Sequence, residues 1–290
     1  LRILYKGDDG LYHIPLTFSD EYGKAQETSM NIALARWGFK TLLDICTRLK
    51  LNDPLVPVWK EHLDKIADYH TNENGIMIGK GVPFAKPHRH YSHMLGIFPF
   101  YETNIEDNKA SIPMLKKTIQ HFTDVDGDNC MYKFSGASSI WSSLGNGDSA
   151  LKWVNRSLDI FPRIGEIPKI PTCTPNTMYC ERGNPTFESP ISSSRSMLDM
   201  LIQSWGNVIR VFPAMPAAWK DASFYQLRAE GAFLLSAKRE NGKTRFIHIK
   251  SLAGEPCIIQ SDLPADVKII GITSNRLQQK NGKIFLNLKK

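Results

Sequence analysis

The chain of 290 residues has 36 Lys and Arg against 29 Asp and Glu, a formal net charge of +7, and 42% of its residues are hydrophobic. These values are ordinary for a globular chain, and the length allows one large domain or two. The basic residues are scattered rather than clustered, which argues against a nucleic-acid partner. No apolar stretch approaches the roughly 18 residues that a membrane-spanning helix needs.

The cysteines give little structural information. There are five, an odd number, and none forms a C-x-x-C pair. Cys173 and Cys180 could close a small loop, but we expect no disulfide framework in a chain of this size. The chain begins with Leu1 rather than Met and shows no signal-like segment, so its start does not indicate a compartment.

The first two thirds of the chain show helical periodicity. Apolar residues recur at i, i+3 and i+4 in several windows, Pro57 suits a first helical turn, and Asp148 suits an N-cap. The long span 162–190 is rich in proline and has no periodicity, which predicts a functional loop. The expected helices are 28–50, 57–66, 109–122, 135–144, 149–161 and 192–205.

The pattern changes near residue 208 to short alternating segments, and Asn241-Gly242 between two of them is a hairpin signal. We therefore predict two domains, helical over 1–207 and antiparallel β over 208–290. Helix pairs joined by long polar loops suggest a toroid of helical hairpins with a cleft at one end. The expected strands are 224–228, 233–239, 244–250, 257–260, 267–272 and 283–288.

One segment concentrates polar side chains beside an apolar run. Residues 87–99 read PHRHYSHMLGIFP, with three histidines in six positions. A metal site would want a nearby carboxylate or thiolate, and none lies within this segment. A buried, fully hydrogen-bonded histidine network is a second interpretation. We favour a third, a pocket wall whose donors, acceptors and Arg89 fork bind a hydroxyl-rich ligand.

Several segments, in order along most of the chain, resemble the C-terminal half of glycoside hydrolase family 95, the α-L-fucosidase and α-L-galactosidase family. They read FSDEYG at 18–23, HRHYSH at 88–93, PTFESP at 185–190, MLIQSW at 200–205, RVFPA at 210–214 and LRAEGAF at 227–233. The resemblance implies a mainly α chain, with an (α/α)6 toroid followed by a small antiparallel β-domain. It also implies inverting hydrolysis of α-linked L-sugars without metal or organic cofactor. Six or seven helices are visible where this toroid has twelve, so we expect it to be incomplete on its N-terminal side.

The resemblance also assigns the two carboxyl groups of the reaction. Glu21 matches the family's general acid in an S-P-E context, with Asp20 in place of Pro. Glu188 aligns with the base-side Asp, although the family's glycines are replaced here. Inversion requires the two carboxyls to lie roughly 6.5–9.5 Å apart. Apolar neighbours such as Phe18 and the like charge of Asp20 would raise the pKa of the Glu21 carboxyl.

The remaining expectations concern binding and context. The substrate would be an oligosaccharide or polysaccharide, and the resemblance implies secretion or a periplasmic location. A non-catalytic carbohydrate-binding or structural remnant of such an enzyme is one alternative, and a metal hydrolase centred on the histidines is another. The oligomeric state is not indicated. The expected substrate-binding residues are His88, Arg89, His90, Tyr91, His93, Asn176 and Tyr179.

Overall fold

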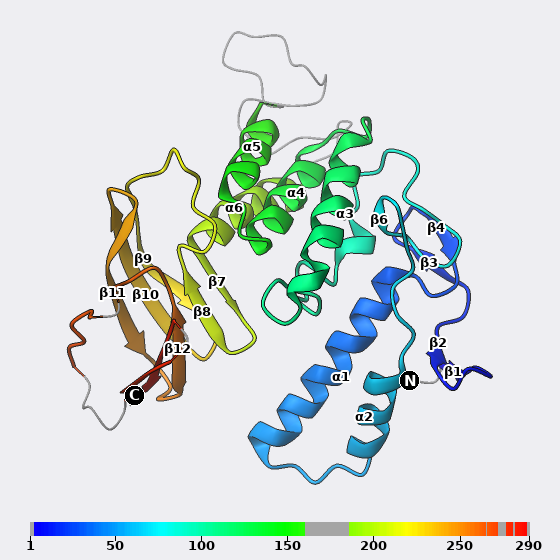
Figure 1. The fold of residues 1–290 in the computed structure, drawn as a ribbon, viewed down its shortest axis with the longest axis horizontal. Helices are drawn as coiled ribbons and strands as arrows, with labels where there is room; N and C mark the ends of the chain where they lie inside the picture. Colours follow the sequence, from blue (N-terminus) through cyan, green and yellow to red (C-terminus); the bar gives the residue numbers. More distant parts are fainter. Residues whose placement is uncertain (1–2, 160–185, 265, 272–276, 281, 289–290) are drawn as a thin grey trace. The chain divides into compact units, whose positions relative to one another are not determined.

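The protein is described from a computed structural model that covers residues 3–159, 186–264, 266–271, 277–280 and 282–288 (Figure 1). The chain forms two compact units, residues 1–133 and 134–290. Within the described residues, the six α-helices all end by Leu201, and strands longer than three residues begin only at Ile202. A helical part followed by a β part is therefore confirmed. No helix in these ranges is long and apolar enough to cross a membrane.

Two antiparallel helices dominate the first unit. Helix α1 (Ser29–Leu49) packs on α2 (Val56–Lys65), with Phe39 and Cys46 of the first helix against Trp59 of the second. Pro57 occupies the first turn of α2, as predicted. The other elements are the strand pairs β1 (Tyr5–Lys6) with β2 (Tyr12–His13), β3 (Thr17–Ser19) with β4 (Gly23–Ala25) and β5 (Thr71–Asn72) with β6 (Gly75–Ile76), the 3-10 turns η1 (Ser92–Met94) and η2 (Lys109–Ser111), and helix α3 (Ile112–Asp124).

Helix α1 is apolar on more than the face that contacts α2. Leu34 is 46% exposed, Trp37 is 42% exposed and Leu49 is 65% exposed, although their spacing follows the helical pattern. Trp37 stacks on Phe100 at 5.2 Å between ring centroids. An incomplete toroid would leave such a face, and that incompleteness stays a prediction.

The three helices after residue 130 differ from their predicted limits. They are α4 (Met131–Ser143), α5 (Gly147–Leu158) and α6 (Glu188–Leu201). Asn146 caps α5, because its side-chain oxygen accepts from the Ser149 amide at 3.0 Å, whereas the predicted cap, Asp148, accepts from the Ala217 amide at 2.7 Å. The expectation of a helix running to residue 205 was also wrong. Residues 202–205 form a strand that turns through Gly206 and Asn207, both at positive φ, as a two-residue hairpin allows.

Two sheets form the β part. One has the order β13-β14-β12-β8-β7 and the other β11-β10-β9. Strand β8 pairs with β12 in parallel, so the part is not purely antiparallel as expected. The predicted strand at 267–272 is absent over its described residues, 267–271. The strands are β7 (Ile202–Trp205), β8 (Val208–Val211), β9 (Ala222–Ala229), β10 (Phe233–Glu240), β11 (Lys243–Ser251), β12 (Pro256–Gln260), β13 (Leu277–Lys280) and β14 (Lys283–Asn287).

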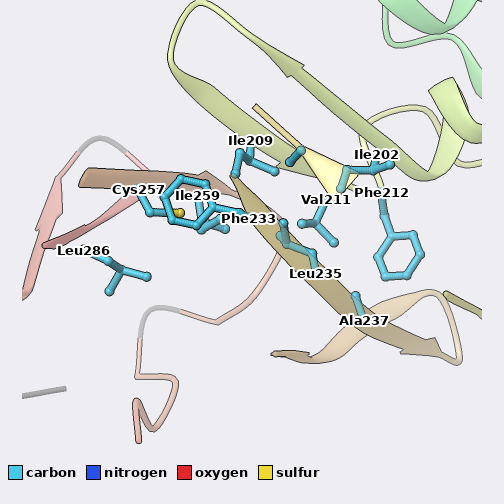
Figure 2. Packing of buried hydrophobic residues seen from close by; sticks show 11 residues of the cluster. Ile202, Ile209, Val211, Phe212, Phe233, Leu235, Ala237, Cys257, Ile259 and Leu286 are labelled. Carbon is cyan, nitrogen blue, oxygen red and sulfur yellow. The ribbon is translucent and has the colours of Figure 1, made fainter. Parts of the chain in front are cut away.

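The inner faces of these two sheets share one apolar core (Figure 2). Phe233 and Leu235 of β10 lie in the same cluster as Val211 of β8 and Ile259 of β12, and all four are at most 2% exposed. Burial of each such side chain contributes about 1.5–3 kcal/mol relative to exposure. The burial of Cys257 in the same cluster raises the pKa of its thiol to about 12. Cys46 and Cys130 are also buried, while Cys173 and Cys180 lie outside the described residues.

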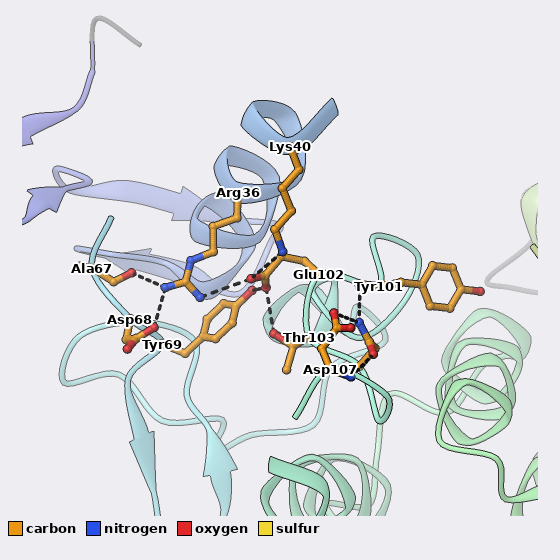
Figure 3. Close-up of polar contacts among 10 residues, drawn as sticks. Arg36, Lys40, Ala67, Asp68, Tyr69, Tyr101, Glu102, Thr103 and Asp107 are labelled. Carbon is orange, nitrogen blue, oxygen red and sulfur yellow. Dashed lines mark hydrogen bonds and ion pairs between the residues drawn. The ribbon is translucent and has the colours of Figure 1, made fainter. Parts of the chain in front are cut away.

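A polar network fixes the segment that follows the histidine motif (Figure 3). The buried carboxylate of Glu102 accepts from the Tyr69 hydroxyl at 2.6 Å and from the Thr103 hydroxyl at 2.8 Å. Arg36 on α1 donates to Glu102 at 3.4 Å and to Asp68 at 2.5 Å. A Cβ placed on Gly96 would lie 2.4 Å from the Tyr69 hydroxyl, so this approach requires glycine.

A second buried carboxylate organises the start of α1. Glu27, 3% exposed and at a positive φ of 50°, contacts His13 and His70 with its two oxygens. Burial disfavours its charge, but these two histidines outweigh that cost and lower the pKa of Glu27. His13 also contacts Asp9 at 2.9 Å, and Asp9 and Glu27 together raise the pKa of His13. Lys80 adds a further favourable charge to Glu27.

We predict that Glu27→Gln lowers the free energy of unfolding by about 2 kcal/mol, because it removes the charge that both imidazoles contact. The contribution of Glu27 is present above its ordinary pKa of 4.5 and is lost as pH falls through the lowered folded value. The contribution of His13 to stability is present below its ordinary pKa of 6.5 and is lost as pH rises through its raised pKa in the folded state. The difference between wild type and variant in urea unfolding should therefore peak between these pH values. The exposed Glu73→Gln is the control, and an equal loss at every pH would contradict this account.

Candidate active site

Glu21 lies at the tip of a hairpin turn. Strands β3 and β4 pair with Ser19 opposite Gly23, so residues 20–22 form the loop, and the Tyr22 amide donates to the Ser19 carbonyl at 2.7 Å. Glu21 has a φ of 56°, a left-handed conformation that costs energy for a residue with a side chain. The Ser19 hydroxyl contacts that of Ser92 at 3.0 Å, which ties the turn to η1 in the histidine motif.

Tyr22 holds the loop that leads into the histidine motif. Its hydroxyl accepts from the amides of Ala85 at 2.7 Å and Lys86 at 3.2 Å, and donates to the Pro83 carbonyl at 3.3 Å. Its ring stacks on that of Phe84, with centroids 5.4 Å apart. The residue after Glu21 therefore sets the path of the chain toward His88.

Arg89 links two carboxylates that are far apart in the sequence. Its Nη2 pairs with Oε2 of Glu21. Its backbone amide donates to Oδ2 of Asp128 at 2.8 Å, and its Nη1 lies 3.9 Å from the same oxygen. Two acceptors thus fix both the backbone and the side chain of Arg89, so the guanidinium is positioned against Glu21 before any ligand binds.

His90 lies between Asp20 and Glu21. Its Nδ1 is 2.9 Å from Oδ2 of Asp20, and its Nε2 is 3.5 Å from Oε2 of Glu21. Since a carboxylate only accepts, Asp20 selects the tautomer with the proton on Nδ1 and leaves Nε2 facing Glu21. Asp20, His90 and Glu21 thus form a line, although the buried Nε2 atom of His90 makes no hydrogen bond to the described residues in this structure.

The other predicted binding residues in this segment are buried. His88 is 7% exposed, and its Nδ1 accepts from the His90 amide at 2.9 Å. Burial is the main reason why the pKa of His88 is lowered. Tyr91 stacks on Tyr132 at 5.5 Å between centroids. His93 stacks on Phe84 at 4.9 Å and is 2% exposed, and burial lowers its pKa to about 3. These three residues are buried, in the same sequence motif as Arg89 and His90. Their direct contact with a sugar stays a prediction.

A buried lysine holds the loop that presents Asp128. Lys133 is 1% exposed, and its ammonium donates to the carbonyls of Val125 and Gly127, both at 3.0 Å. It also lies over the Phe122 ring at 5.5 Å. Burial lowers the pKa of Lys133, and the charges of Asp126 and Asp128 oppose that shift.

Lys133→Met is expected to lower the free energy of unfolding by about 2 kcal/mol, because it leaves two carbonyls without their donor. The exposed Lys60→Met on α2 is the matched control and should change stability by no more than about 0.5 kcal/mol. Thermal unfolding followed by circular dichroism measures both. Equal stability of wild type and Lys133→Met would show that the loop does not depend on this ammonium.

The setting of Glu21 differs from the apolar one that was expected. Phe18 is 53% exposed, and the Glu21 side chain is 55% exposed with Arg89 and His90 as its neighbours. Asp20, expected to act on Glu21 as a like charge, is instead paired with His90. The expectation failed because both side chains are exposed on the hairpin, and charged and polar groups rather than apolar ones contact the Glu21 carboxyl.

Glu188 was expected in a loop and is instead the exposed first residue of α6. A carboxylate in this position is favoured by the helix dipole. Glu188 belongs to the second unit and Glu21 to the first, and their pairing across one sugar stays a prediction. Asn176 and Tyr179 lie outside the described residues.

Asp128, Tyr132 and Lys133 are residues of this site that the sequence reasoning missed. The acidic turn DVDGDN at 124–129 is the sequence signal for Asp128. The roles of Tyr132 and Lys133 depend on three-dimensional contacts that have no local pattern. Among the described residues, no group of three or more His, Cys, Asp or Glu is arranged to hold a metal ion.

Two protein-family models match this chain. The model of the glycosyl hydrolase family 95 catalytic domain matches residues 12–183, and that of the glycoside hydrolase family 95 C-terminal domain matches residues 203–290. The chain therefore belongs to glycoside hydrolase family 95. Alpha-L-fucosidase 2 of Arabidopsis thaliana is 24% identical to it over 255 residues, which are 82% of this chain and 30% of that protein.

These matches bear differently on the two proposed catalytic residues. Glu21 and the histidine motif lie inside the range matched by the catalytic-domain model, whereas Glu188 lies between the two matched ranges. The chain spans about 30% of the length of the curated relative that it matches. The domain boundary at 207–208 stays a prediction.

Proposed function

We propose that this chain carries the acid side of a glycosidase active site and that Glu21 protonates the leaving oxygen of an α-L-fucosyl or α-L-galactosyl bond. The observation that carries the proposal is the strained turn that holds Glu21 between Arg89 and His90. Backbone strain at a polar residue with two fixed partners is typical of functional sites. The family membership supports the reaction class, and the name of the plant relative supports fucose as the first sugar to test.

The mechanism follows from the line of groups at Glu21. A general acid must carry a proton when the substrate arrives and must regain one after each turnover. With its Nδ1 proton held by Asp20, His90 exchanges a proton with Glu21 through Nε2 when the 3.5 Å separation between Nε2 and Oε2 shortens to a hydrogen bond. Arg89, anchored by Asp128, stabilises the carboxylate that remains when Glu21 has given up its proton.

The base side of the proposal rests on Glu188. In an inverting reaction this carboxylate removes a proton from a water that attacks the anomeric carbon from the face opposite the leaving group. Glu188 is the exposed first residue of α6, so a water can reach its carboxylate. An oligosaccharide or polysaccharide substrate and an extracellular or periplasmic location belong to the same proposal.

The direct test is hydrolysis of an aryl α-L-fucoside, with the α-L-galactoside in parallel. We expect Glu21→Gln and Glu188→Gln each to lower kcat by roughly 10²–10⁴-fold, the usual contribution of a general acid or base. An aryl substrate with a good leaving group should rescue Glu21→Gln partly and Glu188→Gln not at all. NMR of the first product gives the stereochemistry, and retention would contradict the inverting mechanism.

Glu106→Gln is the matched control, because it changes a carboxylate outside this site, and it should retain activity. If the chain binds the sugar but wild type and variants all fail to hydrolyse it, the non-catalytic alternative replaces the proposal. If Glu188→Gln retains full activity while Glu21→Gln does not, the base must be sought elsewhere in the chain.

The link between Asp20 and His90 gives a separate prediction. Asp20→Asn should lower kcat by roughly 10- to 100-fold with little change in KM, because one hydrogen bond to a charged group is lost. The pH dependence of kcat should change as well, since Asn no longer fixes the His90 tautomer. An unaltered pH profile together with an unaltered kcat would show that His90 does not act on Glu21.

A further inference from the structure

The outer face of the three-stranded sheet carries an unusual combination of side chains. On β10, Phe233, Leu235 and Ala237 point into the core, so the alternate residues Leu234, Ser236 and Lys238 point outward. The pairing register places one row of side chains across the sheet at each of these positions. The rows are Arg228, Leu234 and Lys250; Gln226, Ser236 and His248; and Ser223, Lys238 and Phe246.

A β-bulge on each edge strand accompanies an exposed aromatic side chain. On β9, Leu227 and Phe224 pair with Leu235 and Ala237, so Tyr225 and Gln226 together face Ser236. Gln226 has a positive φ of 52°, and Tyr225 is 78% exposed. Bulges are frequent where a strand must redirect a side chain.

The bulge on β11 repeats this arrangement on the other edge. Phe246 pairs with Lys238 and Thr244 with Arg239, which leaves Arg245 as the extra residue. Phe246 is 49% exposed. Burial of two large aromatic rings would normally stabilise a fold, so their exposure on one sheet face needs another explanation.

Positive charge is concentrated on the same face. Arg228 and Lys250 flank Leu234 in the first row, and neither has an ion-pair partner among the described residues. In the third row Lys238 contacts Glu240 at 2.5 Å, and Arg245 lies 3.8 Å from the same carboxylate. Glu240 is the one acidic side chain that contacts these cations in the described part of the sheet, so the face has a net positive charge.

We propose that this face binds an anionic polysaccharide, with sugar rings on Tyr225 and Phe246 and uronate carboxylates on Arg228 and Lys250. Flat aromatic surfaces bind the apolar faces of pyranose rings, and the fixed cations select chains with negative charge. The Gln226 amide, which donates to the Tyr225 hydroxyl at 3.1 Å, orients that ring. Glycan is the polymer that a family 95 chain meets, which favours it over nucleic acid.

The test uses the full chain and native affinity electrophoresis in gels that contain polygalacturonate, neutral dextran or single-stranded oligo-dT. We expect retardation by polygalacturonate and none by dextran. Tyr225→Ala and Phe246→Ala should each weaken binding roughly five- to tenfold. The double variant R228A/K250A should weaken it at least as much and remove most of its salt dependence.

Tyr5→Ala and Lys60→Ala, an exposed aromatic and an exposed cation of the first unit, are the matched controls and should bind like wild type. Thermal unfolding of every variant shows whether it is folded. Polygalacturonate binding that survives all four face substitutions would overturn the proposal. Equal retardation by oligo-dT, lost in the same variants, would also overturn it and assign the face to nucleic acid.

Discussion

The geometry of the candidate site depends on Arg89, which contacts two acidic side chains. Arg89 contacts Glu21 through its side chain and Asp128 through its backbone amide, and these acids come from a hairpin and from a loop more than a hundred residues later. Arg89 therefore ties the strained turn at Glu21 to the acidic loop at Asp128, with its guanidinium on the first carboxylate and its backbone amide on the second.

Each partner of Arg89 is itself supported by buried polar contacts. Ser19 and Ser92 join the hairpin to the motif, and Lys133 fills the loop around Asp128. The network of Glu102, Tyr69 and Arg36 fixes the segment that follows the motif. Buried polar groups are costly when they are unpaired, so these contacts stabilise the segment where chemistry is proposed.

Much of the fold could be predicted from the sequence, because α1 and strands β9, β10 and β11 follow strong periodic patterns. The errors arose where the pattern was ambiguous. Leu201 and Ile202 continue a helical spacing, yet pairing with β8 turns residues 202–205 into a strand. For the site, the histidine motif pointed to Arg89 and His90. Asp128, the partner of Arg89, lies in a loop whose carbonyls accept from the buried Lys133. Its position is set by tertiary contacts that no local spacing encodes.

The burial of Lys133 affects the chemical reactivity of its amine. Its amine is enclosed by two carbonyls and an aromatic ring, so it is screened from amine-directed reagents and from enzymes that acylate lysine. Exposed lysines such as Lys60 would be labelled first. Covalent labelling of Lys133 would therefore indicate that the loop around Asp128 had opened. The absence of labelling at Lys133 would indicate that this loop is intact.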